Sequence, residues 1–298
     1  MNSVRAYYYL AKPGIVYGNS IAAIAGFLLA SSIGFDITAF VAMLVGTMSV
    51  MASACVVNNM IDRDIDIAMA RTKQRALVTG QISLRAAAVY ATILGVLGIT
   101  VLSVATTMTA TWVAMFGFFA YVFLYTYSKR YTVHSTLIGT LSGATPPVIG
   151  YTAVTGQLDL TALLLFLLLV AWQMPHFYAI SIFRRSDYAA AHIPVLSVVR
   201  GNAAVRRQIT AYCLLYIVVC IVLGYYDSLS WFSAAALVFV GTCWLALCIQ
   251  PTSDDNMWAR RVFRFSLLVL LVSCVIISLD GLFWQGALGA STGVSRYG

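Results

Sequence analysis

The chain has 298 residues, of which 61% are hydrophobic and only 9% are charged, and its mean hydropathy is +0.89. Because soluble domains carry roughly 25% charged residues, this composition excludes a water-soluble protein and makes the lipid bilayer its main solvent. The net charge of +8 does not call for nucleic acid, since cations beside membrane spans orient a chain and attract anionic lipids.

Continuous apolar runs dominate the sequence, and a run needs about 20 residues to cross the hydrocarbon core. Barrel strands would alternate apolar and polar residues instead, so these runs predict helices. We therefore expect an all-α fold, a polytopic transmembrane helix bundle forming a single domain over residues 1–298. About nine transmembrane helices are predicted, in chain order Ile15–Ser32, Thr38–Val57, Ala86–Ala105, Thr109–Tyr127, Ser135–Val154, Leu160–Phe183, Ile209–Gly224, Leu229–Ile249 and Phe265–Phe283.

The basic residues fall on one side of these alternating spans. Seventeen of the eighteen Lys and Arg residues lie there, and Arg296 alone lies opposite, where the loops carry Asp36, Asp159 and Asp227. The positive-inside rule makes the basic side cytoplasmic. The sequence thus predicts a multi-pass protein of the bacterial inner membrane, with its N-terminus in the cytoplasm and its C-terminus outside.

The end of the second span carries a polar stripe. Asn58, Asp62 and Asp66 are spaced by four, so on a helix they share one face. A carboxylate facing lipid would cost about 2.5–3.5 kcal/mol, so the stripe must face water or a wet cavity. Such hard oxygen ligands suit Mg²⁺, which usually binds one or two carboxylates plus substrate phosphates. The alternative is a solvated helix end paired with nearby arginines.

A basic segment follows this stripe. Arg71, Lys73 and Arg75 place three cations within five residues, which suits an anion held by metal on one side and by basic side chains on the other. A diphosphate fits, and the chemistry would be ionisation of an allylic C–O bond. We assign Arg63 to the same diphosphate-binding set.

Several motifs together carry a family resemblance that extends from about residue 8 to at least residue 265. The chain resembles the UbiA-type intramembrane prenyltransferase superfamily and, within it, the protoheme IX farnesyltransferases (heme O synthases). The stretch Trp172–Phe177, of the form W-Q-x-P-H-F, is more specific to that branch than the Asp motif. The other matching stretches are Lys12–Ile15, Asn58–Asp66, Arg71–Arg75, Gly143–Gly150, Asp187–Tyr188 and Ile193–Leu196.

The resemblance implies a bundle around a central cavity that cytoplasmic loops cap. Farnesyl diphosphate would bind with Mg²⁺ at Asn58, Asp62 and Asp66, which would be the catalytic and metal-binding residues. Loss of diphosphate would leave an allylic cation that the 2-vinyl group of heme B attacks, and water would complete heme O. The product would pass to a heme-using oxidase or a heme A synthase.

Two departures from the superfamily pattern affect the site. A second D-x-x-x-D motif often follows the sixth span, and here only Asp187 of it remains, as a metal ligand through water or as an arginine partner. The usual R-P-L reads Arg75-Ala76-Leu77, which changes loop stiffness rather than chemistry.

Tyr125 and Lys129 match the superfamily's Y-x-x-x-K diphosphate pair. The alternative is an interfacial Tyr beside a Lys that extends its amine toward the membrane surface.

The acceptor side of the predicted site rests on the sixth span. His176 follows Pro175 inside that span, where a proline frees a backbone carbonyl, and it could ligate heme iron or hold a propionate. An interhelical hydrogen bond is the competing role. We assign Trp172, Gln173 and, in the following loop, His192 to heme binding as well.

Two other functions compete with heme farnesylation. A quinone-pathway prenyltransferase would share the Asp motif, but the degraded second motif and the W-Q-x-P-H-F stretch favour heme. An ion-coupled transporter would use Asp62 and Asp66 as coupling-ion ligands. Such a site should lie near the membrane midplane, whereas these carboxylates lie at a helix end beside a basic loop.

Overall fold

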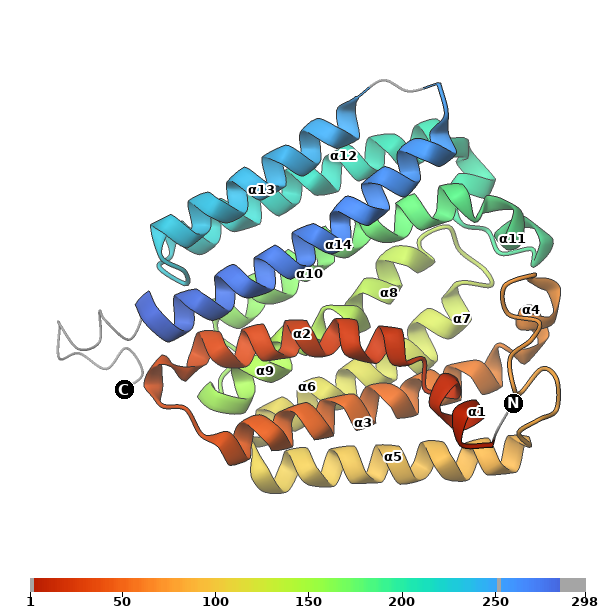
Figure 1. The fold of residues 1–298 in the computed structure, drawn as a ribbon, viewed down its shortest axis with the longest axis horizontal. Coiled ribbons are helices and arrows are strands. Elements are labelled where there is room, and N and C mark those ends of the chain that lie inside the picture. Colours follow the sequence, from red (N-terminus) through yellow and green to blue (C-terminus); the bar gives the residue numbers. More distant parts are fainter. Residues whose placement is uncertain (1–2, 251–252, 285–298) are drawn as a thin grey trace.

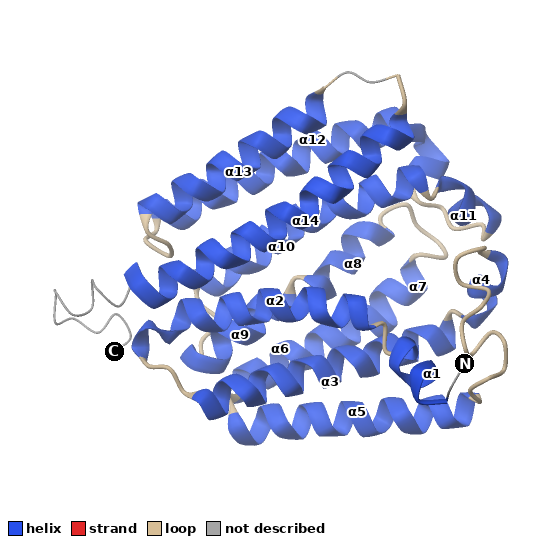
Figure 2. Cartoon of the chain, viewed as in Figure 1, coloured by secondary structure: helices blue, strands red, loops and turns tan. Residues whose placement is uncertain are grey.

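The computed structural model describes residues 3–250 and 253–284, and every regular element within them is helical, as Figures 1 and 2 show. The predicted all-α membrane bundle is confirmed. Its elements are α1 (Ser3–Leu10), α2 (Pro13–Ala30), η1 (Ser31–Ile33), α3 (Ile37–Ile61), α4 (Arg63–Ala68), α5 (Leu84–Ala105), α6 (Met108–Phe119), η2 (Ala120–Tyr125), α7 (Thr126–Ser128), α8 (Ser135–Gly143), α9 (Thr145–Thr155), α10 (Leu160–Phe183), α11 (Arg185–Ala190), α12 (Leu196–Tyr225), α13 (Trp231–Ile249), α14 (Asp255–Leu279) and η3 (Asp280–Trp284).

Eight helices in the described part of the chain are long and apolar enough to cross a bilayer. They match eight of the nine predicted spans, with η2 and α7 continuing α6 into one span over Met108–Ser128. Polar caps begin several of them. Asp36 accepts hydrogen bonds from the backbone N–H groups of Thr38 and Ala39 at the start of α3, and Asp159 caps α10 in the same way, which satisfies donors that a helix leaves unpaired.

The remaining predicted span, Ser135–Val154, is present as two shorter helices, α8 and α9, which meet at Ala144. Pro146 and Pro147 lie in the first turn of α9, where the missing N–H of proline is tolerated but an unbroken helix is not. At the far end of α9, Thr109 Oγ1 donates to the Gly156 carbonyl at 2.7 Å. This contact brings the end of α9 to the start of α6, so α8 and α9 together run the length of the bundle.

Helix α12 begins well before the predicted start at Ile209. Its first turns contain Gly201, whose φ of 75° interrupts the helix. Arg206 lies 4.4 Å from the ring of Trp258 and donates to Asp255 at 3.2 Å. Contacts with the start of α14, rather than hydrophobicity, therefore extend this helix beyond the apolar run.

Three short helices, α1, α4 and α11, lie together at one end of the bundle, on the right in Figure 1. Helix α1 precedes the first span, and α4 and α11 lie in the predicted basic segments between spans. Helix α3 leads directly into α4, so the polar stripe lies at this end as well.

Candidate active site

The polar stripe crosses the junction of α3 and α4. Asn58 lies in the last turn of α3, Asp62 between the two helices and Asp66 in α4. The Asp62 N–H donates to the Asn58 carbonyl and the Asp66 N–H to the Asp62 carbonyl, so the four-residue spacing continues through the junction. The three residues are only 2–3% exposed, which places their side chains inside the protein and away from lipid.

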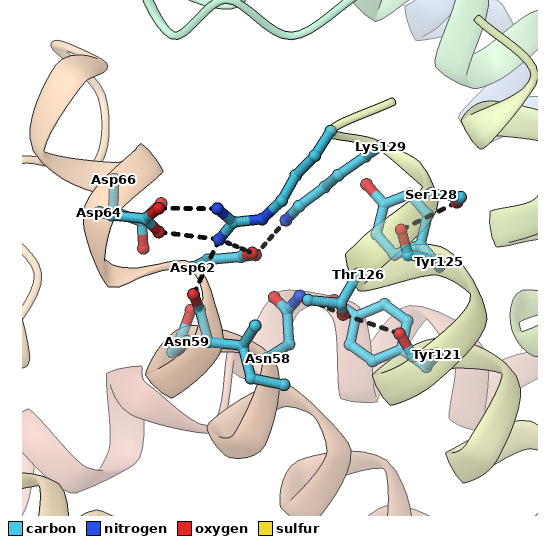
Figure 3. Close-up of polar contacts among 12 residues, drawn as sticks. Asn58, Asn59, Asp62, Asp64, Asp66, Tyr121, Tyr125, Thr126, Ser128 and Lys129 are labelled. Carbon is cyan, nitrogen blue, oxygen red and sulfur yellow. Dashed lines mark hydrogen bonds and ion pairs between the residues drawn. The ribbon is translucent and has the colours of Figure 1, made fainter. Parts of the chain in front are cut away.

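Each member of the stripe contacts a cation from a different part of the chain. Lys12 Nζ donates to Asn58 Oδ1, and Lys129 Nζ donates to Asp62 Oδ2. Arg75 Nη1 donates to Asp66 Oδ2 at 2.6 Å. Figure 3 shows Lys129 reaching Asp62 from the segment that also carries Tyr125 and Tyr121.

One carboxylate oxygen in the cluster has no hydrogen-bond partner among the residues that the structure describes. Asp62 Oδ1 is buried, and Arg130 Nη2 lies 3.9 Å from it. Buried polar atoms without partners are rare, and a hard cation would satisfy this one. The described residues contain no group of three His, Cys, Asp or Glu placed to hold a metal. Two carboxylates and one amide oxygen suit Mg²⁺, which takes its remaining ligands from phosphates and water.

The two lysines at the site are unusual cations. Burial lowers the pKa of Lys12 to about 8, and burial also lowers the pKa of Lys129, although Asp62 opposes that shift. Desolvation disfavours a charged amine unless an anion lies nearby. A bound polyanion would supply that charge, so these lysines are suited to a phosphate-bearing substrate.

The structure brings some of the predicted diphosphate ligands to this cluster and leaves others outside it. Tyr125 stacks on Tyr121 with ring centroids 5.5 Å apart, and Lys129 Nζ lies 5.5 Å from the Tyr125 ring. The side chains of Arg63 and Lys73 are exposed to solvent.

Arg71 is also exposed, but it lies beside Tyr188 of α11. Burial raises the pKa of Tyr188, and the positive charge of Arg71 opposes that shift. Arg71 therefore connects the basic loop after α4 to the loop after α10. It lies at the edge of the cluster rather than against the carboxylates.

Asp187 and His192 lie in the loop after α10. Asp187 forms an ion pair with Arg184 at 3.6 Å, which is the arginine-partner alternative of the sequence prediction. His192 is exposed, with a left-handed φ of 53°. The structure records no direct contact between either residue and Asp62 or Asp66, so their predicted roles in metal and heme binding stay predictions.

The residues predicted to bind heme lie where α10 packs against α14. Trp172 Nε1 donates to the Ser266 carbonyl at 2.7 Å, and His176 Nδ1 lies 2.8 Å from Ser266 Oγ. The Gln173 side chain instead donates to its own helix, at the Leu169 carbonyl. The interhelical hydrogen bond that competed with a substrate role for His176 is therefore present, and it uses one of the two ring nitrogens.

Sequence reasoning missed several members of the cluster. Lys12 stands in a stretch that carried the family resemblance, and its φ of 52° turns the chain directly before Pro13. Asn59 accepts from Arg75 Nη1 at 3.0 Å, and Thr126 accepts from the Asn58 amide at 2.8 Å. A lysine preceding a proline at a span's predicted cytoplasmic end was the available signal for Lys12, whereas nothing local marked Thr126.

Comparison with known proteins shows which family the chain belongs to. A profile of the UbiA prenyltransferase family matches residues 19–287. Protoheme IX farnesyltransferase of Pectobacterium carotovorum subsp. carotovorum is 46% identical over 94% of this chain and 96% of its own length. The protein of that name from Escherichia coli O139:H28 is also 46% identical, over 93% of this chain and 94% of its own.

The chain belongs to the UbiA prenyltransferase family. It groups there with proteins named protoheme IX farnesyltransferase, and it is a membrane prenyltransferase. Its long apolar helices and bacterial relatives make it a multi-pass inner membrane protein.

Solved UbiA structures share the fold of this prenyltransferase. A digeranylgeranylglyceryl phosphate synthase superimposes with a TM-score of 0.76 at 18% identity, covering 95% of this chain and 99% of its own. A UbiA homolog from Archaeoglobus fulgidus, bound to GPP and Mg²⁺, superimposes with a TM-score of 0.69 at 13% identity, covering 92% and 99%. At these identities the likeness establishes the fold alone.

Proposed function

We propose that this UbiA prenyltransferase transfers the farnesyl group of farnesyl diphosphate to the 2-vinyl group of heme B, giving heme O and diphosphate. The observation that carries the proposal is 46% identity, over nearly the full length of both chains, to proteins named protoheme IX farnesyltransferase. The buried cluster of oxygen ligands and cations at Asn58, Asp62 and Asp66 supports it, because a diphosphate needs both.

The diphosphate would be held by two kinds of group. Lys12, Lys129 and Arg75 supply positive charge in a buried setting, where charge-assisted hydrogen bonds are strong. Bound at the polar stripe, Mg²⁺ would add positive charge beside the leaving group. The three cations now contact the stripe itself, and short side-chain movements would turn them toward phosphate oxygens.

The reaction breaks the farnesyl C1–O bond, and its electron pair leaves with the diphosphate. Stabilising this charge is the main catalytic task of the cluster, since fixed cations in a water-poor site act most strongly on charge that develops in the transition state. The vinyl group of heme B then forms a C–C bond to farnesyl C1. Water adds to the resulting cation and releases a proton, which leaves the hydroxyethylfarnesyl group of heme O.

The acceptor would lie toward α10 and α14, where Trp172 and His176 are the predicted heme contacts. His176 donates or accepts through one ring nitrogen at Ser266, so the second nitrogen is the candidate ligand for heme iron. We propose that heme O then passes to a downstream heme-using oxidase or a heme A synthase.

Heme extraction tests the proposal directly. Membranes that contain the full chain should convert added heme B and farnesyl diphosphate to heme O, detected by mass, and a prenylated benzoate from the same membranes would reassign the acceptor. Chelation of Mg²⁺ should reduce product formation at least about 100-fold, with recovery on adding the metal back. Full activity in chelator would contradict the proposed use of Mg²⁺.

A further inference from the structure

A continuous series of aromatic rings runs along the contact between α10 and α14. Trp172 stacks on His176 with ring centroids 4.9 Å apart and an interplanar angle of 26°. His176 lies 4.9 Å from Phe263, which lies 5.7 Å from Phe183 near the end of α10. These four side chains, which we call the aromatic series, lead from the interior of the bundle to its predicted cytoplasmic end.

An arginine stands at the outer end of the aromatic series. Arg260 places its guanidinium carbon 4.9 Å from the Phe183 ring centroid. Its side chain is exposed, and no ion pair to it is found within the described residues. Arg184 also lies over Phe183, at 5.9 Å, but it pairs with Asp187.

This arrangement combines two kinds of recognition. Aromatic side chains bind flat apolar rings by stacking and by edge-to-face contact. A guanidinium held over a ring keeps its hydrogen-bond donors directed outward, and its planar fork matches a carboxylate. A ligand that satisfies both would be a flat ring system with carboxylate groups at one edge.

We infer that Arg260 binds a carboxylate of the acceptor, while the aromatic series contacts the acceptor's flat ring. The inference rests on the proposed function and specifies how it is carried out. Heme B has this chemistry, since its two propionates lie on one edge of the macrocycle. Arg260 would hold that edge at the cytoplasmic surface and direct the opposite, vinyl-bearing edge into the bundle.

The competing explanation is that Arg260 reaches lipid headgroups, as many arginines at span ends do. Its neighbour Arg261 provides a matched control, because it is also exposed and its side chain donates a hydrogen bond to Met257 of its own helix. If Arg260 binds lipid headgroups, substitution of either arginine should affect heme B affinity to a similar extent. If Arg260 binds the acceptor, only its own substitution should weaken the binding of heme B.

The test is an absorbance titration of the purified full chain with heme B and with heme B dimethyl ester, in the absence of farnesyl diphosphate. The wild-type protein should bind heme B about tenfold more tightly than the ester. Arg260→Gln should lose that preference, Arg260→Lys should keep part of it, and Arg261→Gln should keep it fully.

Equal binding of the acid and the ester by the wild-type protein would overturn the inference without relying on any variant. Unchanged heme B affinity in Arg260→Gln would overturn it as well. Heme O formation, measured separately, tests the proposed function. Heme O formation without a preference for heme B over its ester would support the proposed function and overturn this inference. A preference for heme B over its ester without heme O formation would support this inference and contradict the proposed function.

Discussion

Two carboxylates only two residues apart have opposite environments at this site. Asp62 is buried against Lys129, and one of its oxygens has no hydrogen bond within the described part of the chain. Asp64 points outward and accepts two hydrogen bonds from Arg130, at 2.7 and 2.8 Å, which lower the pKa of Asp64 to about 2. Helical geometry separates them, because residues two apart point about 200° away from each other.

This difference predicts different effects for the same substitution. Asp62→Asn should reduce farnesyl transfer by about 100-fold or more, because it removes charge from the proposed metal ligand. Asp64→Asn should leave activity within about fivefold of wild type, since exposed ion pairs contribute about 0–1 kcal/mol. Initial rates of heme O formation would measure both, with insertion checked by membrane yield. Equal losses would contradict the assignment of Asp62.

The contribution of the Asp64–Arg130 pair to folding stability should depend on pH in a defined way. Because the pKa of Asp64 is lowered from its ordinary value of 3.8 to about 2, the pair's contribution is complete above pH 3.8 and is lost only as pH falls toward 2. The small stability difference between wild type and Asp64→Asn should therefore be the same at about pH 6 and about pH 8. Thermal unfolding in detergent at both values would measure it, and a difference that grows with pH would contradict this origin.

Lys12 lies far from the Asp motif in sequence, yet it contacts Asn58. Lys12→Met should raise the KM for farnesyl diphosphate about tenfold or more, because it removes one partly buried cation from the proposed diphosphate site. Lys12→Arg should restore much of the affinity. Arg85→Met, which removes an exposed cation from the start of α5, is the control, and an equal rise in KM there would indicate a general effect of charge.

At the scale of helices, small residues decide how closely α2 and α9 approach. A Cβ added to Gly26 would lie 1.9 Å from the Pro147 carbonyl oxygen, and one added to Gly150 would lie 1.9 Å from the Ala23 carbonyl oxygen. Both neighbours are backbone atoms, which cannot turn aside as a flexible side chain can. Close backbone approach through small residues is a common way for helices to associate in lipid.

Gly26→Ala should therefore destabilise the protein by about 1–3 kcal/mol, which corresponds to a fall of roughly 5 °C in Tm. Gly18→Ala lies on the same helix, and an added Cβ there meets nothing within 4 Å. It should be neutral or stabilise the helix by up to about 1 kcal/mol. Thermal unfolding in detergent compares the two variants, and equal Tm values would show that this crossing tolerates a methyl group.

At the scale of the whole molecule, the one-sided distribution of basic residues predicts the orientation in the membrane. Arg85 at the start of α5 should be cytoplasmic, and Gln157, between α9 and α10, should be outside. Arg296, the single cation predicted to lie outside, falls beyond the described residues. The positive-inside rule gives this arrangement its physical basis.

Cysteine labelling of intact cells tests the orientation. With the exposed Cys243 replaced by Ser, a membrane-impermeant maleimide should label Gln157→Cys and leave Arg85→Cys unlabelled until the cells are lysed. The reverse pattern would invert the topology and place the Asp62 cluster outside the cell. Labelling of both residues in intact cells would show a loss of the membrane barrier rather than a change of orientation.

Features that depend on neighbouring residues could be predicted from the sequence alone. Hydropathy within a window of one span length located the helices, and four-residue spacing put Asn58, Asp62 and Asp66 on one side of the chain. Ser135–Val154 was predicted as a single span, but it forms two helices, because Pro146 and Pro147 lie in the first turn of α9 and α9 packs against α2. Helix α12 was predicted too short, because packing against Trp258 rather than apolar composition extends it.

Only the tertiary structure decided which distant groups complete the cluster. Lys12 lies 46 residues from Asn58, and Lys129 lies 67 residues from Asp62. Likewise, Trp172 and His176 find Ser266 on another helix. Periodicity and hydropathy describe the solvent that a segment prefers, and they bring no information about which segment it meets. Hydropathy and residue spacing therefore determined the membrane bundle and its carboxylate stripe, whereas helix packing determined which cations and aromatic rings surround the stripe.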